Sequence, residues 1–77
     1  MSFTDKQGQY LAFIHAYERV AGRPPAEADM QRHFAVTPPT VHQMVLKLEQ
    51  LSLIRRTPGK ARSIELLVPP EQLPILR

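Results

Sequence analysis

Four cationic side chains lie close together in the second half of the sequence, and their spacing indicates a surface for anionic groups. Arg55, Arg56, Lys60 and Arg62 occur with no acidic residue among them. A hairpin over this stretch would present them to a row of phosphates, or place one arginine of its turn in a minor groove. Because side chains alternate along a strand, Arg55 and Arg56 should point opposite ways, so at most one should face a given duplex closely.

A group of residues earlier in the sequence, on what should be the open side of a helix, has the chemistry to read bases. The amide of Gln43 can make a bidentate pair with adenine from the major groove, and Thr40 can meet a thymine methyl group. His42 can donate or accept a hydrogen bond, according to its tautomer. Together with Pro39, these are the predicted base-contacting residues. The alternative interpretation is ordinary surface polarity.

A helix must position these residues, and the sequence predicts one from Pro38 to about Leu51. The Thr37 hydroxyl can cap it, while Pro38 fills the first helical position, where a missing amide hydrogen costs nothing. Apolar residues at helical spacing form its predicted core side, namely Val41, Met44, Val45, Leu48 and Leu51. The opposite side carries the base-contacting residues and Leu46. We expect Thr37, through its backbone, and Lys47 to contact phosphates.

The positive charge of the chain is concentrated in the same stretch. The net charge is +3, and residues 32–62 hold six lysines and arginines against Glu49 alone. The segments on either side, residues 1–31 and 63–77, each carry one more acidic than basic residue. A basic block is often only a solvated face, but this one coincides with the predicted helix and hairpin. That coincidence favours nucleic acid as the partner.

Two earlier helices and the hairpin complete the scaffold. Thr4 and Gln7 have the spacing of a capping box, and the helix that they begin should end near Ala21, before Gly22. Its predicted core face carries Tyr10, Phe13, Ile14 and Tyr17. A second helix should follow the prolines at 24–25 and end near Phe34.

The hairpin and the tail follow the third helix. Residues 57–60, Thr-Pro-Gly-Lys, are a turn signal between a strand that starts at Leu53 and a strand over residues 64–68. The predicted fold class is therefore mainly α with a small β-hairpin, a winged helix-turn-helix of three helices plus a two-stranded wing. It should occupy residues 1–68, and residues 69–77 should form an extended Pro-rich tail.

The composition limits the other possibilities. The chain has 77 residues, 43% hydrophobic and 22% charged, which suits one folded module. It has no cysteine, no membrane span and no secretion signal, so we expect a cytoplasmic protein without disulfides or thiolate metal sites. His15, His33 and His42 lack metal-ligand spacing, and no paired carboxylates share a helical face. We therefore expect no enzyme activity, metal or cofactor.

Several short segments carry a resemblance to a known family. They are Pro24-Pro25, Met30-Gln31-Arg32-His33-Phe34, Thr37-Pro38-Pro39-Thr40-Val41 and Leu53-Ile54-Arg55-Arg56. Their order resembles the DNA-binding domain of LexA-type repressors, over residues 4 to about 67. The resemblance implies a transcriptional regulator whose third helix reads the major groove of double-stranded DNA and whose wing holds the phosphate backbone.

The resemblance also has departures in the residues that would read bases. The family's Ser-Pro-Asn-Ala segment falls on residues 37–40, and its pair of glutamates falls on His42 and Gln43. Pro39 lacks the amide of an asparagine, and His42 and Gln43 can donate where glutamates only accept, so a different operator is implied. The family's self-cleaving protease domain has no counterpart in these residues, so we expect no self-cleavage.

A rival interpretation is a winged helix that binds another protein. The exposed third-helix surface with Leu46, or the tail, would then be the contact surface. The apolar residues at 66–68 and 73–76 could also form a weak homodimer contact through the tail. An electrophoretic shift with random duplex DNA would separate the two functions.

Overall fold

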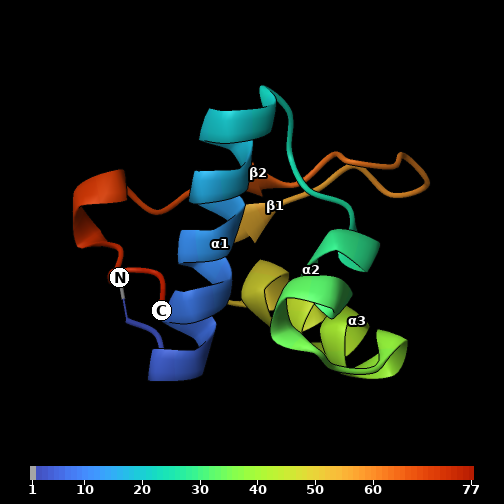
Figure 1. Ribbon diagram of the computed structural model, residues 1–77, viewed down its shortest axis with the longest axis horizontal. Helices are drawn as coiled ribbons and strands as arrows, with labels where there is room; N and C mark the ends of the chain where they lie inside the picture. The colour runs from blue at the N-terminus through green and yellow to red at the C-terminus, as the bar shows by residue number, and fades with distance from the viewer. Residues whose placement is uncertain (1) are drawn as a thin grey trace.

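The computed structural model describes residues 2–77 and has the predicted mainly helical fold. The elements are α1 (Asp5–Ala21), α2 (Glu27–Phe34), α3 (Pro38–Gln50), β1 (Ile54–Arg55), β2 (Glu65–Leu66) and the short 3-10 helix η1 (Pro70–Gln72). The strands pair antiparallel, and the loop between them projects past α2 (Figure 1). Within residues 2–77, no helix is long and apolar enough to cross a membrane.

The helix boundaries follow from local signals in the sequence. The capping box is confirmed, since the Thr4 hydroxyl accepts from the Gln7 amide at 3.1 Å and the Gln7 side chain accepts from the Thr4 amide at 2.9 Å. Gly22 ends α1 with φ of 75° and donates its N–H to Glu18, in the left-handed conformation that glycine adopts without strain. Both ends of α1 are therefore closed by local hydrogen bonds.

The core lies where α1, α3 and the hairpin meet. Buried side chains from these elements and from α2 include Tyr10, Leu11, Ile14, Met30, Val41, Val45, Leu48, Leu53 and Ile54. Tyr10 stacks on Phe34 with ring centroids 4.1 Å apart, which joins α1 to α2. The prediction for Leu51 is wrong, because α3 ends at Gln50 and Leu51 is 41% exposed just beyond the last turn.

The strands are shorter than predicted. Each has two residues, paired Ile54 with Leu66 and Arg55 with Glu65. On the turn side of the strands, a side chain takes the place of backbone–backbone hydrogen bonds. The Ser63 hydroxyl donates to the Thr57 carbonyl at 3.1 Å and accepts from the Thr57 amide at 3.0 Å. The wing, defined here as residues 56–64, is therefore held by turn chemistry more than by a sheet.

The C-terminal segment is not the free extended tail that the sequence predicted. Residues 69–77 fold back along α1, where the buried Gln9 side chain donates to the Ile75 carbonyl at 2.9 Å and accepts from the Arg77 amide at 2.8 Å. Leu73 and Leu76 pack against the core. The physical reason is that the Gln9 side chain offers both an amide donor and an acceptor to the backbone of this segment. The C-terminal residue consequently lies beside the start of α1, where Arg77 pairs with Asp5.

Candidate nucleic-acid interface

The start of α3 brings together Thr37, Pro38, Pro39 and Thr40, all of them exposed. The predicted cap is wrong in detail, because the Thr37 hydroxyl makes no capping bond and instead lies 2.9 Å from the Thr40 hydroxyl. With prolines at the first two helical positions, those positions have no N–H for a side chain to cap. The two threonine hydroxyls therefore hydrogen-bond to each other at the N-terminus of α3.

The predicted base-contacting residues share the exposed side of α3. Pro39, Thr40, His42 and Gln43 are all exposed, whereas Val41 and Val45 on the opposite side are fully buried. Lys47 continues the same exposed surface one turn later. The burial pattern thus confirms that α3 has one packed side and one side available to a partner.

His42 does not stand alone on this side. Its Nδ1 lies 3.2 Å from both carboxylate oxygens of Glu27, the first residue of α2. The His42 side chain remains 52% exposed, so the contact holds one edge of the ring and leaves the rest open. Sequence reasoning missed Glu27, because an acid at a helix start already has a role near the helix dipole and nothing local points to a histidine 15 residues away.

The tip of the wing is a tight turn that presents Lys60. Lys60 donates its N–H to the Thr57 carbonyl at 3.1 Å, and Gly59 adopts φ of 77°, as the predicted turn requires. The Lys60 side chain is exposed, and among residues 2–77 its amine has no ion-pair partner. Lys60 is therefore the wing cation that is most available to an anionic ligand.

The two arginines of β1 and the wing are each paired with a carboxylate. Arg55 donates to its cross-strand partner Glu65, with Nε–Oε1 of 3.0 Å and Nη2–Oε2 of 2.8 Å. Arg56 donates through Nε to Glu49 of α3 at 3.0 Å. The two neighbouring arginines therefore reach different partners, one on β2 and one on α3. Arg55 is the more exposed, since 68% of its side chain is accessible against 24% for Arg56.

Arg62 departs from the predicted row of outward-facing cations. Its Nη1 donates to the Asp29 carboxylate at 2.9 Å, to the Tyr17 hydroxyl at 3.1 Å and to the Pro24 carbonyl at 3.3 Å. The backbone at Arg62 has φ of 53°, a left-handed conformation that non-glycine residues seldom adopt. The side chain turns inward because Tyr17 of α1, Asp29 of α2 and the Pro24 carbonyl between the two helices offer it three acceptors at once.

The carboxylate that pairs with Arg62 belongs to Asp29, which is buried, with only 6% exposure. A backbone hydrogen bond from Ala26, at 2.8 Å, lowers the pKa of the Asp29 carboxyl, and the charge and hydrogen bond of Arg62 lower it further against the opposing effect of burial. Arg32 also pairs with this carboxylate. The hydrogen bond to Tyr17 raises the pKa of Arg62, so its guanidinium stays charged. Sequence reasoning placed Asp29 at the helix start and missed its partner 33 residues away.

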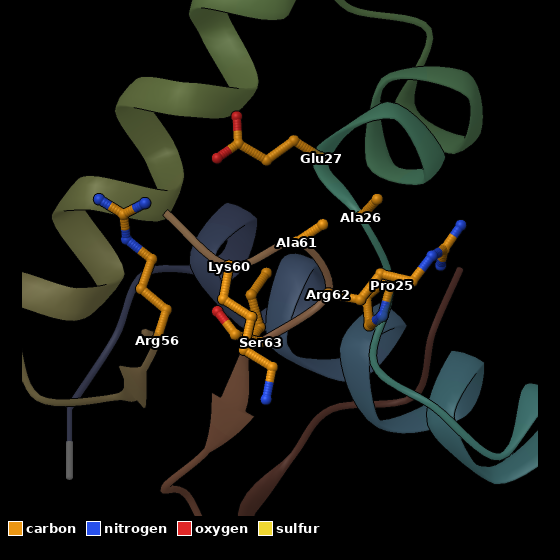
Figure 2. A pocket seen from close by; sticks show the side chains of 9 residues that line it. Pro25, Ala26, Glu27, Arg56, Lys60, Ala61, Arg62 and Ser63 are labelled. Atoms are coloured by element: carbon orange, nitrogen blue, oxygen red, sulfur yellow. The ribbon is translucent and has the colours of Figure 1, made fainter. Parts of the chain in front are cut away.

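A cavity of 170 Å³ separates the wing from the start of α2. It is lined by residues 25–27, Arg56 and residues 60–64 (Figure 2). The Glu27 carboxylate and the Lys60 amine lie at opposite ends of this view. Glu27 thus borders both the wing and His42, so the exposed side of α3 and the wing belong to one surface.

This arrangement defines a class of protein. Three helices followed by a two-stranded ribbon, with the third helix exposed on one side and a cationic turn beside it, make a winged helix-turn-helix.

Comparison with known proteins identifies the family. The model of the LexA DNA binding domain matches residues 1–63, and the chain belongs to this family. Over 72 residues it is 39% identical to the LexA repressor of Thermosipho africanus, covering 94% of this chain and 36% of that protein. Over 71 residues it is 34% identical to the LexA repressor of Bartonella quintana, covering 91% of this chain and 30% of that protein. The chain spans about a third of the length of these curated relatives. As a member of this family it is a DNA-binding domain.

Proposed function

We propose that this domain binds an operator in double-stranded DNA and thereby represses transcription, which is supported by its match to the LexA DNA binding domain and by relatives that are named repressors. The proposal places α3 in the major groove and the wing on the adjacent phosphates. The observation that carries it is the continuity of the two surfaces, since Glu27 contacts His42 on α3 and lines the same cavity as Lys60. Its place of action would be the cytoplasm, where bacterial operators lie.

Base contacts are assigned to the exposed side of α3. Gln43 is the main reader, because its side chain is exposed and an amide can pair with both N6 and N7 of adenine. Thr40 and Pro39 present apolar and hydroxyl surface to a thymine methyl group or a nearby phosphate. His42 contributes through the ring nitrogen that Glu27 leaves open.

Phosphate contacts are assigned to Lys60 and Arg55, with Arg56, Lys47 and the backbone at Thr37 beside them. Arg55 and Arg56 would have to share or exchange their carboxylate partners, a modest cost for pairs that remain partly exposed. Arg62 is no longer in this group. Its contacts support a structural role, in which it holds the wing against α1 and α2.

The test of this function is selection of bound duplexes from a random pool by the intact 77-residue chain. Recovery of a common motif would support sequence-specific binding, and replacement of Gln43 should change the motif at one position. Recovery of random sequence with affinity that does not respond to salt would contradict the proposal, because phosphate contacts release counterions.

One observation supports a second function, binding of a protein partner by α3. Leu46 is 42% exposed and Leu51 is 41% exposed at the end of that helix. Substitution of both by serine separates the alternatives. DNA binding through Gln43 and the wing should survive this change, whereas a protein contact centred on the two leucines should be lost.

The tail offers less exposed apolar surface for self-association than the sequence indicated. Leu66, Leu73 and Leu76 pack against the domain's own core, whereas the large apolar side chain of Ile75 in the tail is 87% exposed. A weak homodimer would have to centre on Ile75. The mass in solution of the Ile75→Ser variant tests it, because self-association that persists unchanged would exclude the tail as the contact.

A further inference from the structure

The contact between Glu27 and His42 restricts how the histidine can meet a base. Both carboxylate oxygens of Glu27 lie 3.2 Å from Nδ1 of His42. The Glu27 carboxylate points away from the wing (Figure 2), and its partner is on the next helix. His42 is therefore attached by one ring nitrogen to α2, while its side chain as a whole remains 52% accessible.

The chemistry of the pair fixes the direction of the hydrogen bond. An ionised carboxylate has no hydrogen to donate and only accepts, so the hydrogen between the two residues belongs to Nδ1. In the neutral imidazole the second nitrogen, Nε2, then carries no hydrogen and is an acceptor. Such fixing of one ring nitrogen by a carboxylate is how proteins select a histidine tautomer at other sites.

We propose that Glu27 is a positioning residue for DNA reading, which holds the hydrogen of neutral His42 on Nδ1 and so makes Nε2 the base-contacting atom. This inference rests on the proposed function of α3. The matching group in the major groove is an exocyclic amine, N6 of adenine or N4 of cytosine, because those are the donors that the base edges present there. A role of Glu27 confined to the start of α2 would leave the tautomer of His42 unaffected.

The first test uses the free 15N-labelled protein and needs no DNA. Long-range 1H–15N correlation spectra distinguish the two neutral tautomers of histidine, and His15 and His33 serve as internal references. Neutral His42 should carry its hydrogen on Nδ1 in the wild type. In Glu27→Ala it should shift toward the Nε2–H form that free histidine side chains favour in water, whereas Glu18→Ala on exposed α1 should change nothing. An Nε2–H form in the wild type, or a tautomer indifferent to Glu27→Ala, would overturn the inference.

The second test removes the amine from the DNA. At the selected position that depends on His42, adenine is replaced by purine, or cytosine by pyrimidin-2-one, each of which lacks only the exocyclic amine. The wild type should lose roughly two- to tenfold in affinity, the worth of one hydrogen bond. Glu27→Ala should lose less from the same replacement, and Glu27→Gln, which keeps an acceptor oxygen, should retain part of the effect. Equal losses of affinity in the wild type and in Glu27→Ala would contradict the proposed role of Glu27.

The two tests separate the inference from the function on which it rests. If the chain shifted no duplex at all, the proposed function would fail, while the spectra would still report the tautomer. If DNA binding and its sequence preference persisted without the Nδ1–H tautomer, only the role of Glu27 would fail. Thermal unfolding of Glu27→Ala and Glu27→Gln controls for loss of the fold. The two variants should differ in the tautomer of His42 but have similar midpoints of unfolding.

Discussion

Arg62 on the wing donates to the Asp29 carboxylate on α2 at 2.9 Å, and this pair ties the wing to the helical body. Replacement of Arg62 by alanine should leave the Asp29 charge without its wing partner and let the wing move. We expect a lower midpoint of thermal unfolding and a loss of DNA affinity similar to that of Lys60→Ala. Arg55→Ala, which removes an exposed cross-strand pair, is the matched control and should scarcely change the midpoint. Unaltered unfolding of Arg62→Ala would show that the pair holds nothing in place.

The lowered pKa of Asp29 predicts how stability responds to acid. A carboxyl whose pKa is lower in the folded than in the unfolded chain stabilises the fold above its unfolded value, about 3.9, and this contribution is lost as the pH falls through the folded value. The midpoint of thermal unfolding should therefore fall steeply below about pH 4. In Asp29→Asn that part of the pH dependence should be missing, and parallel curves for the two proteins would contradict the assignment.

Gln43 should carry sequence discrimination. Gln43→Ala should reduce the preference for one base pair by about 1 to 3 kcal/mol, the worth of a bidentate contact. Gln50→Ala provides the control, since Gln50 is exposed on the same helix two turns later. Competition between duplexes that differ at that base pair gives the measurement. Equal weakening on every duplex would instead place Gln43 at the phosphates.

Lys60 should contribute affinity without specificity. With about three or four phosphates engaged, the logarithm of affinity should fall with the logarithm of salt concentration at a slope of roughly −3 to −4. Lys60→Ala should make this slope less steep by about 1 and weaken all duplexes alike. Lys6→Ala, at the exposed start of α1, should leave the slope as it is. A slope unchanged by Lys60→Ala would remove the wing tip from the interface.

Gln9 should determine whether the C-terminal segment stays docked. Gln9→Ala removes the donor to Ile75 and the acceptor of the Arg77 amide, which should cost about 1 to 3 kcal/mol of unfolding free energy. The segment should then be cut faster by a protease and exchange its amide hydrogens faster. Gln72→Ala, an exposed change within the same segment, should cost little. Retained protection of residues 69–77 in Gln9→Ala would show that apolar packing suffices.

Local signals in the sequence predicted the elements, and long-range partners decided the rest. The capping box of Thr4, the glycine at 22 and the proline at 38 act within a few residues, so their structural outcome could be predicted directly. Arg62 has the same chemistry whether it faces solvent or Asp29, and the choice depends on acceptors brought close by α1 and α2. No periodicity encodes that proximity.

The same distinction explains the tail and the site. Prolines at residues 69, 70 and 74 predicted an end to regular structure, but they do not specify where the chain goes next, and Gln9 is 66 residues from Ile75. On α3 the exposed residues followed from helical spacing, whereas the orientation of His42 depends on Glu27 across a loop. Amphipathicity predicts which side is available and does not predict which atom is presented.

The docking of residues 69–77 along α1 places the C-terminus beside the start of that helix, away from α3 and the wing (Figure 1). A group joined to Arg77 therefore extends from the side of the domain that lies away from α3 and the wing. A fluorophore, a surface tether or a second copy connected through a flexible linker can be attached there without crowding the proposed interface. The domain can be fused in tandem, and the spacing of two operators could then be matched by the length of the linker.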